Sequence, residues 1–171
     1  MVYDKISQVE NYEHLSRAEL VKAEHELGRE LLRSLLEIHF GITDYEIKIG
    51  EHGKPYLANL PYHFSISHSN GLVACAVADT QIGVDIERRA TVLPEKIRSI
   101  SARFFTIGEI EALKEADYSS EMFFTIWTRK EALSKYFGTP FMECASKSSI
   151  DTDDIITAVN ENYIYSIMTK K

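Results

Sequence analysis

The sequence predicts an α+β fold, and three features of its 171 residues indicate this class. A Ser-x-x-Glu capping box at residues 16–19 precedes leucines at helical spacing, which predicts a long helix ending near Gly41. Three short apolar runs then predict strands at Tyr62–Ser67, Leu72–Ala78 and Ile82–Glu87. The second half switches to helical patterns, and strands segregated from helices are typical of an α+β protein.

Turn residues separate the smaller elements of the first half. Residues 45–49 alternate as a strand does, and Gly53-Lys54-Pro55 marks a turn because proline fixes its own φ and extends the preceding residue. Ser/Asn/Gly and Asp/Thr breaks divide the three apolar runs. We therefore expect a small antiparallel meander.

Capping signals define the helices of the second half. One helix is predicted from Pro94 to Phe105. A Thr-x-x-Glu capping box at residues 106–109 opens a second helix to about Ala116, and a third runs from 120 to 137 before Gly138. The polar tail ends in one predicted strand, Tyr163–Met168.

The composition is that of an ordinary globular protein, with 44% hydrophobic and 26% charged residues. A net charge of −7 disfavours nucleic acid as a partner, and no apolar run has the length of a membrane span. Cys75 and Cys144 have no CxxC spacing, which disfavours a disulfide framework or a zinc site. The N-terminus shows no secretory signal. We expect a cytoplasmic protein.

Acidic residues form the first candidate site. Asp85 and Glu87 lie two residues apart on a predicted strand and point to one face, while Trp127, Glu131 and Lys135 share one stripe of a helix. A solvated strand end and an ordinary helical ion pair are the simpler interpretations. Three converging carboxylates would instead form the oxygen site that Mg²⁺ prefers, with Lys135 reaching a phosphate.

The segment Ser67-His68-Ser69 ends another strand and offers small hydrogen-bonding groups suited to phosphate oxygens. A structural histidine is the alternative. A hydrolase pair is disfavoured because no G-x-S-x-G nucleophile elbow is present. Glu109 occupies the N3 position of a capping box, where glutamate has a structural role.

One segment is basic despite the acidic total. Residues 88–103 contain five arginines or lysines and one glutamate. A solvated helix face and a docking patch for an acidic protein are both compatible with this charge.

The motifs GKP, FSISHS, GVDIE, RFF…E and WTRKEALSK occur here in one order. In this the chain resembles the surfactin-type 4′-phosphopantetheinyl transferases, which attach the phosphopantetheine arm of coenzyme A to a serine of a carrier protein and release 3′,5′-adenosine bisphosphate. The resemblance implies a pseudo-dimer of two similar α+β halves around one cleft, which we place at residues 1–90 and 91–171. Because only 36 residues follow Lys135, we expect the second half to be shortened.

The resemblance also implies roles for individual residues. Those assigned to coenzyme A are Gly53, Lys54, Pro55, Ser67, His68 and Lys135. Those assigned to Mg²⁺ are Asp85, Glu87 and Glu131. The catalytic set is Glu131, Lys135, His68 and Glu109, with Glu131 as the first candidate for the base, Glu109 as the second, and Glu109 expected near the metal. An acidic acyl or peptidyl carrier protein is the implied partner, docking on residues 88–105.

One position departs from the family pattern. Glu24 stands where family members often carry a basic residue for the 3′-phosphate of coenzyme A, so Arg17, Lys22 or His25 would have to replace it. A protein that binds coenzyme A or a carrier without turnover is the alternative function. A Mg²⁺-dependent phosphohydrolase using the same acids is a third.

Overall fold

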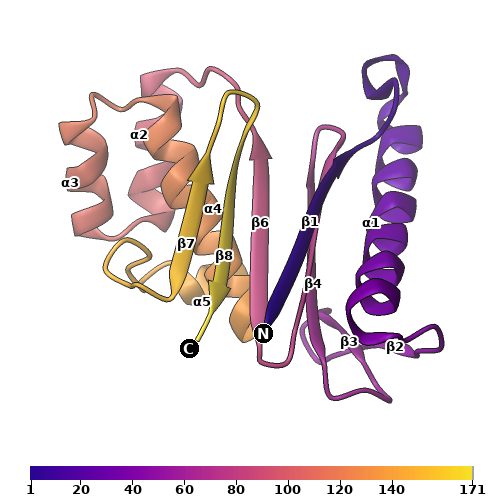
Figure 1. The fold of residues 1–171 in the computed structure, drawn as a ribbon. Helices are drawn as coiled ribbons and strands as arrows, with labels where there is room; N and C mark the ends of the chain where they lie inside the picture. The colour runs from indigo at the N-terminus through magenta and orange to yellow at the C-terminus, as the bar shows by residue number, and fades with distance from the viewer. Residues whose placement is uncertain (171) are drawn as a thin grey trace.

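A computed structural model describes residues 1–170 and confirms the α+β class (Figure 1). The strands are β1 (Val2–Gln8), β2 (Ile47–Ile49), β3 (Pro55–Leu57), β4 (His63–Ser69), β5 (Leu72–Ala78), β6 (Ile82–Arg88), β7 (Ile155–Val159) and β8 (Tyr163–Thr169). The helices are α1 (Arg17–Phe40), α2 (Pro94–Phe104), α3 (Ile107–Glu115), α4 (Ser120–Phe137), the short α5 (Phe141–Cys144) and a 3₁₀ turn (Tyr12–His14).

Two antiparallel sheets carry the fold, and they share one connectivity. The strand order is β1-β5-β4 in the first sheet and β6-β8-β7 in the second, with β2 and β3 forming a separate small ribbon. In both sheets the last strand lies in the centre. In each sheet a long helix, α1 or α4, lies in the sequence between the first strand and the other two. Helices α2 and α3 also lie between β6 and α4, and the β2–β3 ribbon lies between α1 and β4.

Capping sets the limits of the helices as the sequence predicts. The Ser16 and Thr106 hydroxyls accept from the backbone N–H groups of Glu19 and Glu109, and both glutamates bond back to complete the capping boxes. Helix α1 ends at Gly41 and α4 at Gly138, each at φ 66°. Glycine adopts this left-handed backbone at little cost, so both helix ends are encoded locally.

The predicted meander is wrong at its third strand. Strands β4 and β5 pair, but β6 pairs with β8 and lies beside β4 without backbone pairing. Instead, three β4 serine hydroxyls accept the N–H groups of β6: Ser65 from Val84 at 3.0 Å, and Ser67 and Ser69 from Ile86 and Arg88 at 3.3 Å. A hydrophobic run predicts a strand but does not specify its partner.

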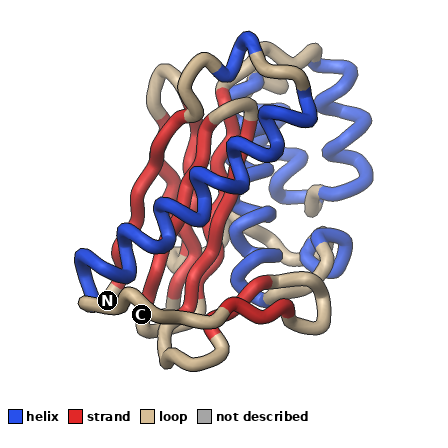
Figure 2. Tube along the Cα trace, turned by 90° about the vertical axis from the view of Figure 1, so that its right-hand side faces the viewer, coloured by secondary structure: helices blue, strands red, loops and turns tan. Residues whose placement is uncertain are grey.

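The core lies on both faces of β5. Helix α1 crosses the first sheet (Figure 2) and packs its leucines against Val73, Cys75 and Val77. The opposite face of β5 packs alanines against β6 and Tyr165 of β8. Because both faces are covered, β5 shows an uninterrupted apolar sequence.

The second sheet holds three strands, as the first does. Strand β7 was not predicted, although four of its five residues are apolar, and only Ile155 among them is buried. The predicted boundary at residue 90 also separates β6 from β8, to which it is hydrogen-bonded. In residues 1–170, no helix has the length and apolarity that crossing a bilayer requires.

Candidate active site

A pocket of about 360 Å³ forms where β4, β6 and α4 meet. Its lining residues are Ile66, Ser67, His68, Asp85, Glu87, Trp127, Glu131 and Lys135. The structure thus brings together six of the residues predicted for the site, from three elements distant in the sequence. The interpretation of Asp85 and Glu87 as a solvated strand end does not hold, since Asp85 is buried and Glu87 is half-buried.

The hydroxyl of Ser67 connects the three elements. It donates to Asp85 Oδ1 at 2.7 Å and accepts from Lys135 Nζ at 2.8 Å, and Ile86 N–H supplies a second hydrogen. Lys135 also forms an ion pair with Asp85 Oδ1 at 2.7 Å. One donor and two lone pairs are the whole capacity of a hydroxyl, so Ser67 is fully used.

Two acidic side chains of the pocket have raised pKa values. Burial raises the pKa of Glu131 to about 7, assisted by the Asp85 and Glu87 carboxylates and opposed by Lys135. The pKa of Glu87 is also raised, again mainly by burial, against the effect of the Ser69 hydroxyl that bonds to it. Mutual repulsion and desolvation therefore disfavour a fully charged cluster without a cation.

No three Asp, Glu, His or Cys side chains of residues 1–170 are already grouped as metal ligands. Asp85 instead has one oxygen on Lys135 and Ser67, while its Oδ2 is buried without a hydrogen-bond partner in this part of the chain. A buried carboxylate oxygen left unpaired is costly. Glu87 and Glu131 line the same pocket, and carboxylate oxygens are the type of ligand that hard divalent cations take.

His68 lies at the rim of this pocket. Its Nδ1 is 3.0 Å from Glu24 Oε2, and its ring packs edge-on to that of His25 at 5.3 Å. Burial lowers the pKa of His68, and the Glu24 carboxylate opposes this shift. Glu24 is therefore the partner of a candidate site residue, which its sequence position alone did not indicate.

The GKP segment lies in an adjoining pocket of about 270 Å³ that shares Ile66 and Lys135 with the first. Gly53, Lys54 and Pro55 all line it. Lys54 Nζ donates to the carbonyl oxygens of Ile82 and Tyr136, at 3.1 and 3.2 Å, and burial lowers its pKa to about 8. This lysine thereby connects β3 to β6 and to the end of α4.

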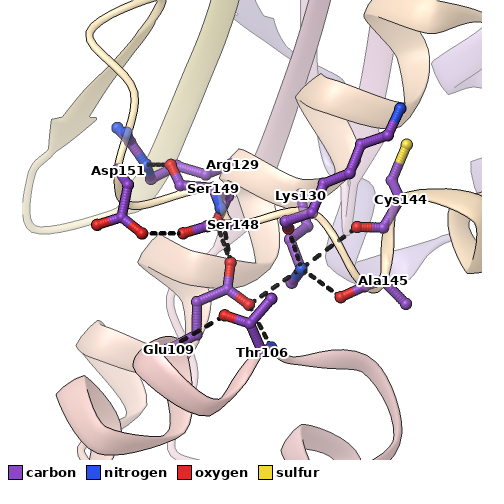
Figure 3. A network of polar contacts seen from close by, with 10 residues as sticks. Thr106, Glu109, Arg129, Lys130, Cys144, Ala145, Ser148, Ser149 and Asp151 are labelled. Atoms are coloured by element: carbon purple, nitrogen blue, oxygen red, sulfur yellow. Dashed lines mark hydrogen bonds and ion pairs between the residues drawn. The ribbon is translucent and has the colours of Figure 1, made fainter.

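Glu109 is not brought into the pocket, contrary to the expectation that it lies near the metal. It is fully buried in a separate network (Figure 3), where Oε2 pairs with Lys130 Nζ at 3.0 Å and Oε1 accepts from the backbone and hydroxyl of Ser149. Lys130 also donates to the carbonyls of Ala145 and Lys147. Glu109 lies in the first turn of α3 and faces the core, which favours a structural role for this residue.

The basic segment is partly neutralised. Arg89 pairs with Glu121 at 2.7 Å, and Arg88 bonds to Gln8 and lies over the ring of Tyr12. Lys96 and Arg103 of α2 are exposed. The positive charge available to a partner therefore lies on α2 rather than at the end of β6.

Comparison with known proteins matches residues 81–167 to the model of the 4′-phosphopantetheinyl transferase superfamily. A 4′-phosphopantetheinyl transferase of Bacillus subtilis is 37% identical over 117 residues, covering 66% of this chain and 50% of the relative. The 4′-phosphopantetheinyl transferase gsp of Aneurinibacillus migulanus is 34% identical over 116 residues, which cover 66% of this chain and 47% of the relative. The 4′-phosphopantetheinyl transferase AcpT of Escherichia coli is 36% identical over 109 residues, which cover 61% of this chain and 54% of the relative.

The matched region of the superfamily model runs from the start of β6 to β8 and includes the acids of β6 and the α4 stripe. The chain spans about half the length of the curated relatives it matches. Because the superfamily model matches residues 81–167, which are half of the chain, the chain belongs to the 4′-phosphopantetheinyl transferase superfamily.

Proposed function

We propose that this protein transfers the 4′-phosphopantetheine group of coenzyme A to a serine of an acyl or peptidyl carrier protein, in a Mg²⁺-dependent reaction. The observation that carries the proposal is the pocket in which Asp85, Glu87 and Glu131 adjoin Lys135. The names of the relatives, all 4′-phosphopantetheinyl transferases, support the same activity.

Asp85, Glu87 and Glu131 would hold the metal, which when bound supplies positive charge against the pyrophosphate of coenzyme A. Lys135 would bind a phosphate oxygen, exchanging part of its contact with Asp85 for that oxygen. His68 and Ser67 line the same pocket and would orient the phosphates. Preorganised charge of this kind stabilises the transition state of phosphoryl transfer.

The carrier serine oxygen attacks the phosphorus that bears pantetheine. The phosphoanhydride bond breaks, and its electron pair leaves with 3′,5′-adenosine bisphosphate. The serine proton needs an acceptor, and we assign it to Glu131, a carboxylate that lines the same pocket as Lys135. Glu109, the second candidate, bonds to Lys130 and Ser149 outside the pocket.

The shared strand order of the two sheets supports the pseudo-dimer as a further part of the proposal. Strands β1, β4 and β5 would correspond to β6, β7 and β8, and α1 to α4. We place the division between Ala78 and Ile82. The site then lies at the junction, with β4 from the first half and β6 and α4 from the second.

Mass spectrometry of a panel of apo carrier proteins incubated with coenzyme A and Mg²⁺ tests the activity. A carrier heavier by one phosphopantetheine group is expected, and Glu131→Gln should abolish it without lowering the unfolding temperature. Coenzyme A binding without any transfer would overturn the proposal in favour of the binding-only alternative. Release of 3′,5′-adenosine bisphosphate without a carrier would favour a phosphohydrolase.

A further inference from the structure

Glu24 is a buried acid on α1, only 3% exposed, with both carboxylate oxygens engaged. Oε1 accepts from the backbone N–H of Gly71 at 2.7 Å, in the turn between β4 and β5. Oε2 lies 3.0 Å from Nδ1 of His68. Because one oxygen is fixed to the backbone, the other is held in place opposite the imidazole.

This contact determines which nitrogen of His68 carries a hydrogen. A carboxylate accepts hydrogen bonds, so the 3.0 Å approach of Oε2 favours a hydrogen on Nδ1. In the neutral imidazole, Nε2 then carries the lone pair. Nε2 makes no hydrogen bond to residues 1–170, and His68 lines the pocket with Asp85 and Lys135.

We propose that Glu24 is a positioning residue of the candidate active site, holding His68 in the Nδ1–H tautomer with Nε2 turned toward the pocket. When coenzyme A binds, Nε2 takes up a proton from water and donates it to a phosphate oxygen, and the Glu24 carboxylate balances the positive charge that this proton places on the ring. The identity of this ligand rests on the proposed function, whereas the tautomer and the ring orientation do not.

The charged or titratable groups around the ring support Glu24 as the positioning residue and His68 as the residue that contacts phosphate. Glu24 and His25 approach it from α1, Lys135 from α4 and Asp85 from β6. Of these, Glu24 is the largest influence favouring the charged imidazole, against burial. At metal sites, removing the residue that fixes the tautomer of a ligand histidine typically lowers metal affinity or activity by about 10–100-fold. We expect an effect of this scale for Glu24.

Nitrogen-15 NMR of the histidine rings in the full chain tests the tautomer without any need for activity. Wild type should show His68 as Nδ1–H. In Glu24→Gln the amide oxygen can keep the bond to Gly71 while its NH₂ group donates to Nδ1, so His68 should change to Nε2–H. Glu37→Gln, an exposed glutamate on the same helix, is the matched control and should leave the tautomer unchanged. An Nε2–H tautomer in wild type, or no change in Glu24→Gln, would overturn the inference.

Calorimetric titration with coenzyme A tests the functional consequence. Glu24→Gln should weaken binding about tenfold, whereas the turnover number of the loaded enzyme should change less. In a His68→Ala background the same substitution should have no further effect, because Glu24 acts through His68. Additive losses in the double variant would assign Glu24 a merely structural role and overturn the inference, as would an unchanged affinity despite the altered tautomer. A wild-type protein that binds no coenzyme A would refute the proposed function alone, because the NMR result is independent of it.

Discussion

Gly83 of β6 lies directly against the carbonyl oxygen of Ala132 in α4, so closely that a β-carbon at position 83 would overlap this oxygen. The same β-carbon would also overlap the backbone of Tyr136. Strand and helix therefore approach backbone to backbone, at a distance that only glycine permits. This approach places Glu131 and Lys135 beside Asp85, two residues further along β6.

The first prediction is that Gly83→Ala forces α4 away from β6. Overpacking typically costs about 1–3 kcal/mol, and rigid backbone neighbours favour the upper part of this range. The ion pair between Lys135 and Asp85 should weaken at the same time. Denaturant unfolding, together with coenzyme A titration, measures both effects. Gly108→Ala in α3 is the control, because a β-carbon there meets nothing within 4 Å, and it should not lower stability.

Much of this arrangement could be predicted from the sequence, because its signals are local. The capping boxes, the glycine helix ends and the apolar run of β5 give α1, α3, α4 and β5 close to their observed limits. The common face of Asp85 and Glu87 follows from strand geometry alone. Period-two serines at 65, 67 and 69 were also visible, although their role in joining β4 to β6 was not recognised.

Long-range relationships could not be predicted in the same way. The pairing of β6 with β8 and of β7 with β8 depends on tertiary packing, since a short apolar run does not specify its partner strand. Glu24 and Glu109 have the same side chain, yet the first bonds to His68 and the second to Lys130. Only the fold determines which acid lies next to the pocket.

Glu109→Gln should reduce the stability of the fold, because Glu109 has a structural role and not a catalytic one. Replacing one partner of a fully buried ion pair leaves Lys130 uncompensated, at a cost of about 3–5 kcal/mol. Chemical denaturation should show this loss. Glu111→Gln, an exposed position of the same helix, should be close to neutral. If Glu109→Gln unfolds like wild type but abolishes transfer, the structural assignment is wrong.

The serine contacts between the sheets should contribute measurably to stability. In Ser65→Ala the N–H of Val84 loses its acceptor in a buried setting, which costs about 1–3 kcal/mol. Hydrogen exchange at the Val84 amide should accelerate more than at the amides of β5. Ser148→Ala is the same substitution in a loop, where the hydroxyl donates to Asp151 in an exposed contact, and it should change stability little. Equal exchange rates in Ser65→Ala and wild type would show that these hydroxyls do not hold the sheets together.

Docking of an acidic carrier protein should depend on α2. Lys96 and Arg103 are exposed, so Lys96→Glu combined with Arg103→Glu should raise the KM for the carrier with little change in the KM for coenzyme A. The effect should diminish at high salt, because exposed charges are screened. Lys5→Glu combined with Lys170→Glu, two exposed positions away from α2, controls for the same change in total charge. An equal loss in this control would point to net charge rather than to a docking site on α2.

The stability of the protein should vary with pH through Glu131. Its folded-state pKa of about 7 lies above the ordinary value of 4.5, so the folded protein holds this proton more tightly than the unfolded chain does. The corresponding stabilisation is complete below pH 4.5 and is lost as the pH rises through 7, by at most about 3 kcal/mol. Glu131→Gln cannot lose a proton there, so its unfolding free energy should be flatter across this range than that of wild type.

Added Mg²⁺ should reverse this loss, since a metal requires the ionised carboxylate. The increase in unfolding temperature caused by Mg²⁺ should therefore be larger at pH 8 than at pH 6. It should disappear in Asp85→Asn, which removes the buried carboxylate whose Oδ2 is unpaired. A Mg²⁺ effect of the same size in wild type and Asp85→Asn, or one that grows as the pH falls, would place the metal elsewhere. Because unfolding temperature is measured without coenzyme A or a carrier, this result tests the acidic cluster independently of the transfer reaction.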